Sequence, residues 1–255
     1  MSNNPISGII YFFNGFSLIT KPSIRKWVVI PLLINILLFS GLIYYAVLYF
    51  PMVSEMFMAQ VESTLPDWGW LVTVVSWLIW PLFIVLTLVV VFFSFTLVAT
   101  LIAGPFTGPL ANAVYEHLTG KAPESASESL SSSFTGIITD PIEKIWYYFK
   151  WAMVLLIISL IPIINIVSPV LWFLFGAWLF VLEYAEVPLA NHGYKTPVQR
   201  QILAQKRLLS LGFGSAVFVT MLIPLLNFFV LPSAVAGATA MWVNQLEKSA
   251  PPPSS

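Results

Sequence analysis

Hydrophobic residues in this chain are gathered into long runs that no charged residue interrupts. Four stretches contain no Asp, Glu, Lys or Arg, and together they make up more than half of the sequence. A water-soluble domain needs charged groups across its surface, so runs of this length predict helices buried in a lipid bilayer. The four stretches are residues 27–54, 68–115, 151–182 and 208–246.

The first two runs are each long enough for a complete transmembrane helix. About 20 residues are needed to cross a hydrocarbon core about 30 Å thick, because a helix rises about 1.5 Å per residue. Residues 27–50 form the first predicted span, which tolerates Pro31 near its start. Residues 68–103 form the second span, and the tryptophans in its first part suit the headgroup level. Gly104 marks the predicted exit.

Prolines and an asparagine interrupt the third and fourth runs near their middles, so neither is predicted to be one straight helix. The breaks cover residues 162–169 and 224–232. The pieces on either side are predicted to fall short of a full crossing, yet the connecting segments are apolar. We therefore expect two re-entrant hairpins, over residues 141–182 and 197–246, whose irregular turns face protein or a water-filled cavity.

The distribution of charge assigns the segments to the two sides of the membrane. Lys21, Arg25 and Lys26 precede the first span, whereas residues 51–67 between the spans carry three acids and no Lys or Arg. The positive-inside rule then places both chain termini in the cytoplasm and this loop outside. A six-span arrangement, with outer turns at the two proline breaks, obeys the same rule and stays open.

The remaining segments are predicted to lie at the membrane surface or in the cytoplasm. Residues 5–20 suit a short amphipathic interfacial helix, and they lack the pattern of a cleaved signal peptide. Residues 117–140 include a Ser-rich stretch and are expected to form a cytoplasmic loop. Asp140-Pro141 and Thr196-Pro197 are expected to cap the helices that lead into the hairpins. Residues 247–255 are expected to be a disordered tail.

The predicted fold class is therefore an all-α integral membrane protein. It comprises two full transmembrane helices, two re-entrant hairpins that penetrate the membrane partially, and interfacial amphipathic helices. Composition supports this, because 58% of residues are hydrophobic, 9% are charged and the mean hydropathy is +0.89, whereas soluble domains average about 25% charged residues.

Composition and motifs also exclude several classes of function. The net charge is zero, so no basic excess is present to bind nucleic acid. The absence of cysteine excludes disulfides, thiolate metal sites and thiol nucleophiles. No HExxH, GxSxG or nucleotide-binding glycine motif occurs. No catalytic residue, cofactor or metal is therefore predicted, and neither an enzyme nor an ATP-driven pump is expected.

One polar cluster follows the third apolar run. It consists of Glu183, Glu186, Asn191 and His192. A solvated cytoplasmic corner, a polar binding site and a metal site are all compatible with these residue types.

The segment before the first span is the strongest candidate for binding chemistry. A glycine-containing turn after Asn14 precedes a helix that Pro22 begins and that carries Arg25 and Lys26 in its first turn. Free N–H groups and the positive end of a helix dipole attract anions, and arginine adds a planar fork that matches a tetrahedral oxyanion. Sulfate and phosphate both fit. Simple anchoring at the inner membrane surface explains these cations equally well.

This segment, which reads LITKPSIRKWVVIPLLIN, resembles the opening of the CysZ family of bacterial sulfate permeases. Similar residues extend over 8–245 and include Ala103-Gly104-Pro105-Phe106, residues 168–175 and Ile223-Pro224-Leu225-Leu226-Asn227. The resemblance implies sulfate uptake across the bacterial inner membrane for cysteine biosynthesis. It also implies an oligomer whose subunits have two full spans and partially penetrating helices. Sulfate, with sulfite as a second candidate, membrane lipid and further copies of the chain are the implied partners, and no nucleic acid is.

The resemblance also implies which residues bind sulfate. The family's site corresponds to residues 18–26 of this chain. Lys26 stands where relatives carry a second arginine, and a lysine keeps the charge but loses the bidentate fork. The implied sulfate-binding residues are Arg25, Lys26, Leu18, Ile19, Thr20 and Ser23.

Polar residues within the apolar segments are the candidate lining of a path for the anion. A divalent anion enters a membrane only if its hydration is replaced, and helix N-termini at mid-membrane can do this. The second half of each hairpin is predicted to begin near Pro169 and Pro232, which would supply such termini. Two spans cannot enclose a pore, so a homo-oligomer is expected. The candidates are Asn35, Asn165, Ser168, Asn227, Ser233 and Glu183.

Two other functions stay open at this point. A channel for another small anion would use the same features. A membrane scaffold that transports nothing is favoured by the lack of charge within the spans, whereas the cations at a helix start and the family resemblance favour transport.

Overall fold

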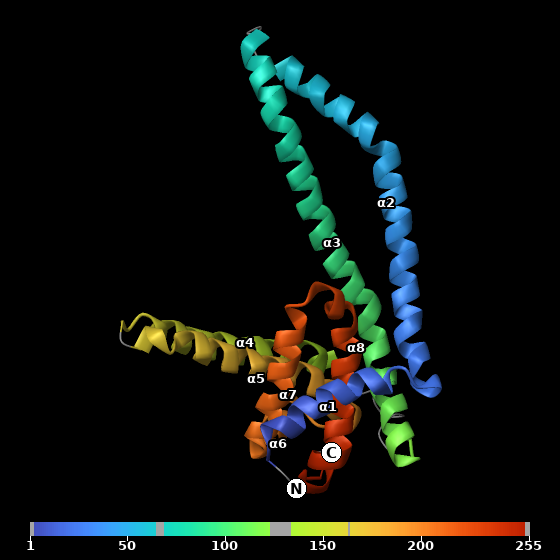
Figure 1. Ribbon diagram of the computed structural model, residues 1–255, viewed down its shortest axis with the longest axis vertical. Coiled ribbons are helices and arrows are strands. Elements are labelled where there is room, and N and C mark those ends of the chain that lie inside the picture. Colours follow the sequence, from blue (N-terminus) through green and yellow to red (C-terminus); the bar gives the residue numbers. More distant parts are fainter. Residues whose placement is uncertain (1–2, 65–68, 123–133, 163, 253–255) are drawn as a thin grey trace. The chain divides into compact units, whose positions relative to one another are not determined.

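Every regular element that the structure describes is a helix, which confirms the all-α prediction (Figure 1). The computed structural model describes residues 3–64, 69–122, 134–162 and 164–252. The helices are α1 (Pro5–Leu18), α2 (Pro22–Thr64), α3 (Gly69–Thr119), α4 (Phe134–Ser159), α5 (Ser168–Asn191), α6 (Thr196–Gln205), α7 (Arg207–Met221) and α8 (Pro224–Met241). Short elements are the 3₁₀ turns η1 (Ile164–Ile166) and η3 (Glu247–Ser249) and the π-helical turn η2 (Trp242–Leu246).

The chain divides into two compact units. One comprises Met1–Val28 and Phe106–Ser255, and the other comprises Val29–Pro105, which holds most of α2 and much of α3. In α2, the 32 residues Pro22–Val53 are long and apolar enough to cross a membrane, at about 48 Å. This agrees with the first predicted span, and Pro31 lies inside the helix as expected.

α1 packs directly against α7 and α8 in the first unit (Figure 1). A Cβ atom on Gly8 would lie 2.0 Å from the carbonyl oxygen of Leu209, and one on Gly15 would lie 1.9 Å from that of Ser233. Since no side chain fits in such a space, α1 approaches both helices through glycine, as closely packed membrane helices often do. Phe12 lies between the two glycines in sequence and is fully buried.

The opposite face of α1 is apolar and exposed. Ile6, Ile10 and Phe13 are more than half exposed. The side chain of Asn4 caps the helix by accepting a hydrogen bond from the N–H of Ile6 at 2.9 Å. α1 is therefore a helix where one was predicted, with a buried glycine face and an outward apolar face.

The first proline break lies close to its predicted place. α4 ends at Ser159 and α5 begins at Ser168, so the interruption brackets Pro162. Its apolar side chains are exposed at this break, where Ile166 is 82% and Leu160 is 74% exposed. The break therefore forms an apolar tip that joins the two helices.

The helices around this break are longer than predicted. α4 begins at Phe134, so Asp140-Pro141 lies within it and does not start it. α5 runs on to Asn191, and its 24 residues are enough to cross a membrane, at about 36 Å. The prediction that this second piece is too short is wrong, because Glu183 and Glu186 do not end the helix. Both remain helical and pair with a lysine on α4.

The second break differs more from the prediction. α7 ends at Met221 and α8 begins at Pro224, so the turn is confined to residues 222–223. Residues 224–232 are helical and do not form the predicted turn, and no helix begins at Pro232, which lies inside α8. The physical reason is that Pro224 occupies the first helical turn, where its missing N–H costs nothing.

The helix before α7 starts where the sequence indicated. α6 begins at Thr196-Pro197, although Lys195 occupies the N-cap position and no side chain caps the helix. α6 and α7 are separated by a bend of 105° at Lys206. Helices α6 and α7 together would make a third candidate span only if such a bent pair crossed the membrane.

Three segment boundaries also differ from the sequence predictions. α3 continues through Gly104 to Thr119, so the predicted exit does not end the helix. The predicted loop 117–140 is helical at both ends, and its Ser-rich middle, like the start of the second span at residue 68, lies outside the described residues. The tail is held in place up to Pro251, whose carbonyl accepts a hydrogen bond from the hydroxyl of Tyr194 at 2.8 Å.

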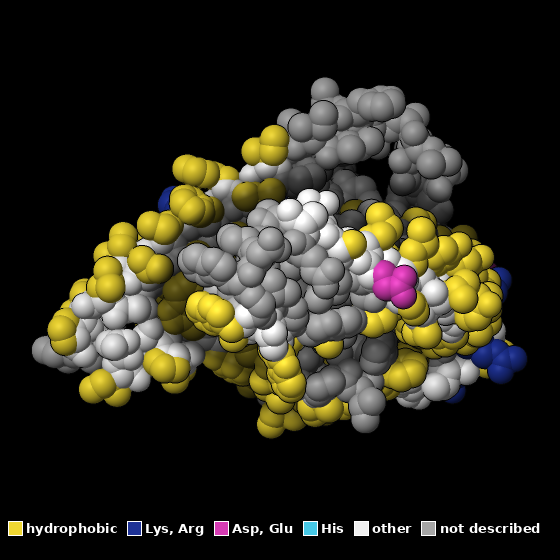
Figure 2. Space-filling view, turned by 90° about the horizontal axis from the view of Figure 1, so that it is seen from above, with side chains coloured by type: hydrophobic (Ala, Val, Ile, Leu, Met, Phe, Trp, Pro, Cys, Tyr) yellow, Lys and Arg dark blue, Asp and Glu magenta, His cyan; other side chains and the backbone are white. Residues whose placement is uncertain are grey.

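The core of the first unit lies among α1, α5, α7 and α8, where mostly aliphatic side chains are buried. Outside it, hydrophobic side chains cover most of the described surface on the face in Figure 2, and charged groups appear only in small patches. An exposed apolar surface of this extent suits a lipid solvent. The chain is therefore a membrane protein with at least two helices able to span a bilayer.

Candidate functional site

The predicted sulfate-binding segment lies where α1 ends and α2 begins. The carbonyl of Leu18 accepts the N–H of Lys21 at 3.0 Å, which closes the turn. The carbonyl of Lys21 then accepts two N–H groups, from Ile24 at 3.0 Å and from Arg25 at 2.8 Å. Pro22 has no N–H. In the described structure, the first turn of α2 therefore keeps one backbone donor without a backbone acceptor, the N–H of Ser23.

This segment combines two buried side chains with a majority of exposed ones. Ile19 is 8% exposed and Ile24 is fully buried, so these two residues anchor the turn in the core. Thr20, Ser23, Arg25 and Lys26 are exposed, and Leu18 is half-buried. The structure thus brings the six predicted residues together in one turn whose polar members face outward.

The two cations of this turn differ in their surroundings. The Nζ of Lys26 lies 5.3 Å from the centroid of the Trp27 ring, a distance typical of a cation–π contact. Among the described residues, Arg25 has no ion pair and no hydrogen bond from its side chain. The hydroxyl of Thr20 already donates to the carbonyl of Ser17 at 2.8 Å. Arg25 and the Ser23 N–H are therefore the donors most available to an incoming anion.

The first pair of pore candidates lies at the break between α4 and α5. Asn165 is exposed, and its backbone N–H donates to the carbonyl of Ile161 at 2.9 Å. Ser168 is buried and its hydroxyl is hydrogen bonded to that of Ser159. Trp172 also donates to Ser159, at 3.1 Å. Ser168 therefore has a local partner, whereas the side chain of Asn165 points away from the core.

The other pore candidates lie on three different helices. Asn227 and Ser233 are both on α8, where Asn227 is exposed and Ser233 is fully buried against Gly15 of α1. Asn35 lies in α2, within the second unit. In the described structure, the hydroxyl of Ser233 and the Oδ1 of Asn35 are buried without a hydrogen-bond partner. These candidates do not gather at one place within a single unit.

Glu183, the last candidate, belongs to an ion-pair cluster that the sequence did not indicate. Lys144 of α4 pairs with Glu183 at 2.6 Å and also with Glu186 of α5. Burial disfavours the charged form of Lys144, but its hydrogen bonds and ion pairs with both carboxylates outweigh burial, so its pKa is raised. Lys144 is far from both acids in sequence, and no periodicity relates helices separated by a break, so no sequence signal pairs them.

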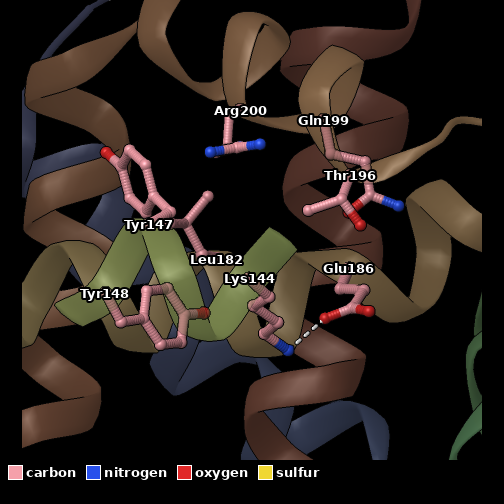
Figure 3. A pocket seen from close by; sticks show the side chains of 8 residues that line it. All are labelled: Lys144, Tyr147, Tyr148, Leu182, Glu186, Thr196, Gln199 and Arg200. Carbon is pink, nitrogen blue, oxygen red and sulfur yellow. Dashed lines mark hydrogen bonds and ion pairs between the residues drawn. The ribbon is translucent and has the colours of Figure 1, made fainter. Parts of the chain in front are cut away.

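This cluster borders a small pocket at the meeting of α4, α5 and α6 (Figure 3). The guanidinium of Arg200 lies over the Tyr147 ring, 4.6 Å from its centroid. Burial raises the pKa of the neighbouring Tyr148 hydroxyl to about 12. The lining residues are Lys144, Tyr147, Tyr148, Leu182, Glu186, Thr196, Gln199 and Arg200.

The polar residues after the third apolar run have separate partners. The side-chain N–H of Asn191 donates to Asn112 at 2.6 Å and to the carbonyl of Gly108 at 2.9 Å. The Nδ1 of His192 lies 2.7 Å from the carbonyl of Pro188, so this nitrogen carries the proton. Because Glu183 and Glu186 turn to Lys144, the four residues of this cluster do not converge on one point.

Comparisons with known proteins identify relatives over nearly the whole chain. Residues 11–232 match the family model described as "Sulfate transporter CysZ/Etoposide-induced protein 2.4". Proteins named "Sulfate transporter CysZ" are similar in three bacteria. The one from Pectobacterium atrosepticum is 38% identical over 94% of this chain and 85% of its own length. That from Pseudomonas syringae pv. tomato is 38% identical over 94% and 93%, and that from Pseudomonas fluorescens is 37% identical over 94% and 94%.

Proposed function

The chain belongs to the sulfate transporter CysZ/etoposide-induced protein 2.4 family, and on that premise we propose that it is a sulfate permease. The similarity to proteins named as sulfate transporters, at 38% identity over 94% of the chain, carries this proposal. The protein would be a transporter and not an enzyme. It would take up sulfate across the bacterial inner membrane for cysteine biosynthesis, passively or down an ion gradient and without ATP hydrolysis.

Capture of sulfate is assigned to the turn between α1 and α2. Arg25 presents an unpaired guanidinium beside the positive end of α2, and such a fork donates two parallel hydrogen bonds to an oxyanion. The Ser23 N–H adds a donor from the helix start. Lys26 supplies charge to the same anion. Leu18, Ile19 and Thr20 shape the turn that holds these donors.

The path through the membrane is assigned to polar groups at the helix breaks. Asn165 is exposed at the tip between α4 and α5, and Asn227 is exposed in the first turns of α8. Ser168, Ser233, Asn35 and Glu183 are further candidates for the path. A sulfate ion crossing a membrane needs hydrogen-bond donors in place of its water, and amides provide them.

The assembly is proposed to be a homo-oligomer in lipid. The two hairpins, α4–α5 and α7–α8, are proposed to enter the membrane partially and return, with α1 in the interface plane. In support, the tip between α4 and α5 is apolar, with Ile166 82% exposed. A subunit with only two full spans, as the sequence predicts, cannot enclose a polar path, so several subunits would share it.

Purified protein in liposomes tests this function directly. Radiolabelled sulfate should enter loaded vesicles through the wild-type protein, and unlabelled sulfate should compete more strongly than phosphate or chloride. Sulfite serves as a competitor to test the second candidate cargo. The double variant Asn165→Leu, Asn227→Leu should reduce the flux at least about tenfold, which corresponds to the loss of about 1.4 kcal/mol of stabilisation along the path.

Two results would count against the proposal. Vesicles that take up no more sulfate than protein-free vesicles would exclude transport by this chain alone. An unchanged flux in the double asparagine variant would exclude the assigned path and leave the permease function itself intact. Ser63→Leu, on an exposed part of α2, is the matched control for adding leucine to the surface.

A further inference from the structure

The pocket among α4, α5 and α6 contains polar groups that have no partner inside the protein. The hydroxyl of Tyr148 and the Nε of Arg200 are both buried, and neither has a hydrogen-bond partner among the described residues. A buried polar atom without a partner costs about 1–3 kcal/mol. Two such atoms beside one pocket therefore indicate a ligand that accepts hydrogen bonds from both.

Arg200 also lacks a counter-ion. Its guanidinium stacks on the Tyr147 ring, which fixes its plane. The nearby carboxylates, Glu183 and Glu186, are both held by Lys144. Within the described structure, no acidic group lies within ion-pair distance of Arg200. The guanidinium of Arg200 at the pocket is therefore half-buried, fixed in orientation and without a counter-ion.

Polar groups line both sides of the pocket. In Figure 3 the Tyr148 hydroxyl points toward Lys144, and Arg200 lies on the opposite side of the pocket from Lys144. The hydroxyl of Thr196, at the first turn of α6, adds another donor to the lining. A ligand that accepts hydrogen bonds on several sides and carries negative charge matches this lining.

The size of the pocket limits how such a ligand sits. The pocket spans about 240 Å³ of empty space when open solvent is included, but only about one water-sized atom fits within it. One oxygen of a small anion would fill this room, and its other oxygens would lie in the open part of the pocket. A large organic ligand would not enter.

We propose that Arg200, Tyr148 and the neighbouring lining of α4 and α6 form a second oxyanion-binding site, separate in its residues from the Arg25 turn. Its ligand is a small tetrahedral oxyanion, either free sulfate or the phosphate group of an anionic lipid. Both offer the same acceptor oxygens and negative charge. The site joins three helices, so its occupation stabilises the packing of α4 on α6.

The test uses the full-length chain in detergent with Arg25→Ala, which removes the main cation of the turn between α1 and α2. Two probes are titrated separately: sodium sulfate against sodium chloride at equal ionic strength, and phosphatidylglycerol against phosphatidylcholine in mixed micelles. Binding is measured by calorimetry and by the midpoint of thermal unfolding. At least one oxyanion probe is expected to bind and to raise the midpoint.

Two further substitutions then identify the site. Adding Arg200→Gln should weaken binding of that probe about tenfold or more, because a charge-assisted hydrogen bond is lost. Tyr148→Phe should weaken it about threefold to tenfold. Without ligand, Tyr148→Phe should unfold at the same or a higher temperature, since it removes an unpartnered hydroxyl. Arg207→Gln, at an exposed arginine of α7, should leave binding unchanged.

The outcomes separate the sources of the ligand and the alternatives. Sulfate binding that depends on Arg200 and Tyr148 identifies free sulfate, and phosphatidylglycerol binding with that dependence identifies a lipid. If neither probe binds, or if Tyr148→Phe and Arg200→Gln leave binding unchanged, the pocket holds water alone and the inference is wrong. Should Arg200→Gln fail to fold, Tyr148→Phe decides alone. None of these results changes the test of sulfate flux, so this site and the proposed permease function fail independently.

Discussion

Three cations of this chain, Arg25, Arg200 and Lys144, show how the surroundings of a residue decide its role. Lys144 is held by two carboxylates and joins α4 to α5. Arg200 is fixed by an aromatic ring and Arg25 is exposed, and neither has a carboxylate partner in the described structure. A cation that is already paired gains little from an anion, whereas an unpaired guanidinium gains a charge-assisted hydrogen bond. Binding is therefore expected at the arginines.

Arg25 is the residue whose loss should weaken sulfate binding most. We expect Arg25→Ala to reduce the affinity for sulfate about tenfold or more, because charge-assisted hydrogen bonds contribute about 1.5–3 kcal/mol. Arg25→Lys should retain part of the affinity, since it keeps the charge and loses the fork. Isothermal titration with sodium sulfate measures both. Arg207→Ala is the control, and equal affinities for wild type and Arg25→Ala would remove this residue from the site.

Lys144 should make stability depend on pH in the alkaline range. Its pKa is raised in the folded protein, so its ion pairs stabilise the fold fully below the unfolded value of about 10.4 and lose their effect as the pH rises through the folded value. Lys144→Met should lose about 1 kcal/mol at neutral pH, a modest amount because solvent screens the partly exposed carboxylates.

Thermal unfolding in detergent between pH 7 and pH 11 measures this effect. The difference in midpoint between wild type and Lys144→Met should shrink above about pH 10.5. Lys150→Met, at an exposed lysine of the same helix, is the control. A difference that stays constant across the range would contradict a stabilising role for these ion pairs.

At the scale of the helices, the position of each proline and glycine decides how elements end and meet. Pro162 lies in the break between α4 and α5, whereas Pro224 opens α8 and Pro232 lies within it. The sequence motifs at the two breaks are alike, so their local residues predict two breaks but not how wide each one is. α8 packs against α1, α5 and α7, and its buried residues begin at Val230. These contacts join residues far apart in the sequence, so the local motif does not reveal them.

The contact of α1 with α8 should depend on the absence of a side chain at Gly15. We expect Gly15→Ala to lower stability by about 1–3 kcal/mol, because its Cβ would meet the carbonyl oxygen of Ser233 and force the helices apart. Gly41→Ala is a matched control: it lies in a helix with no heavy atom within 4 Å of the added Cβ. Alanine there should be neutral or stabilising by about 1 kcal/mol.

The midpoint of thermal unfolding in detergent reports both variants. Trypsin cleavage after Arg25 should also accelerate in Gly15→Ala, since a displaced α1 exposes the start of α2. If Gly15→Ala and Gly41→Ala behave alike, α1 does not pack on α8 as described.

At the scale of the whole molecule, the sequence predicts membrane character and helical class well, because both follow from the length and apolarity of the runs. It also predicts the turn of Arg25, since its glycine-containing turn, proline and cations lie within a few consecutive residues. It does not predict the pairing of Lys144 with Glu183 or the pocket at Arg200. The ion pairs and the pocket depend on which helices are in contact on either side of a break. Those contacts are determined by packing between residues that are distant in the sequence.

The membrane topology of α5 decides where a path for sulfate can lie in this fold. α5 has 24 residues and, at about 36 Å, could cross a bilayer about 30 Å thick, whereas the proposed mechanism has α4 and α5 enter and return. The two arrangements place the tip at Asn165 differently. A full crossing exposes the tip outside the cell, and a re-entrant hairpin keeps it within the membrane.

Single-cysteine labelling distinguishes these arrangements cleanly, because the natural chain contains no cysteine. With a bulky membrane-impermeant maleimide added to intact cells, we expect Asn165→Cys to stay unlabelled. Ser63→Cys, at the far end of α2 and predicted to lie outside, should react, and Lys121→Cys, predicted to be cytoplasmic, should react only after the cells are opened. If Asn165→Cys reacts from outside at the rate of Ser63→Cys, α4 and α5 cross the membrane completely. The apolar tip would then stand in water, and the path for sulfate would have to be sought along full spans and not at a turn within the bilayer.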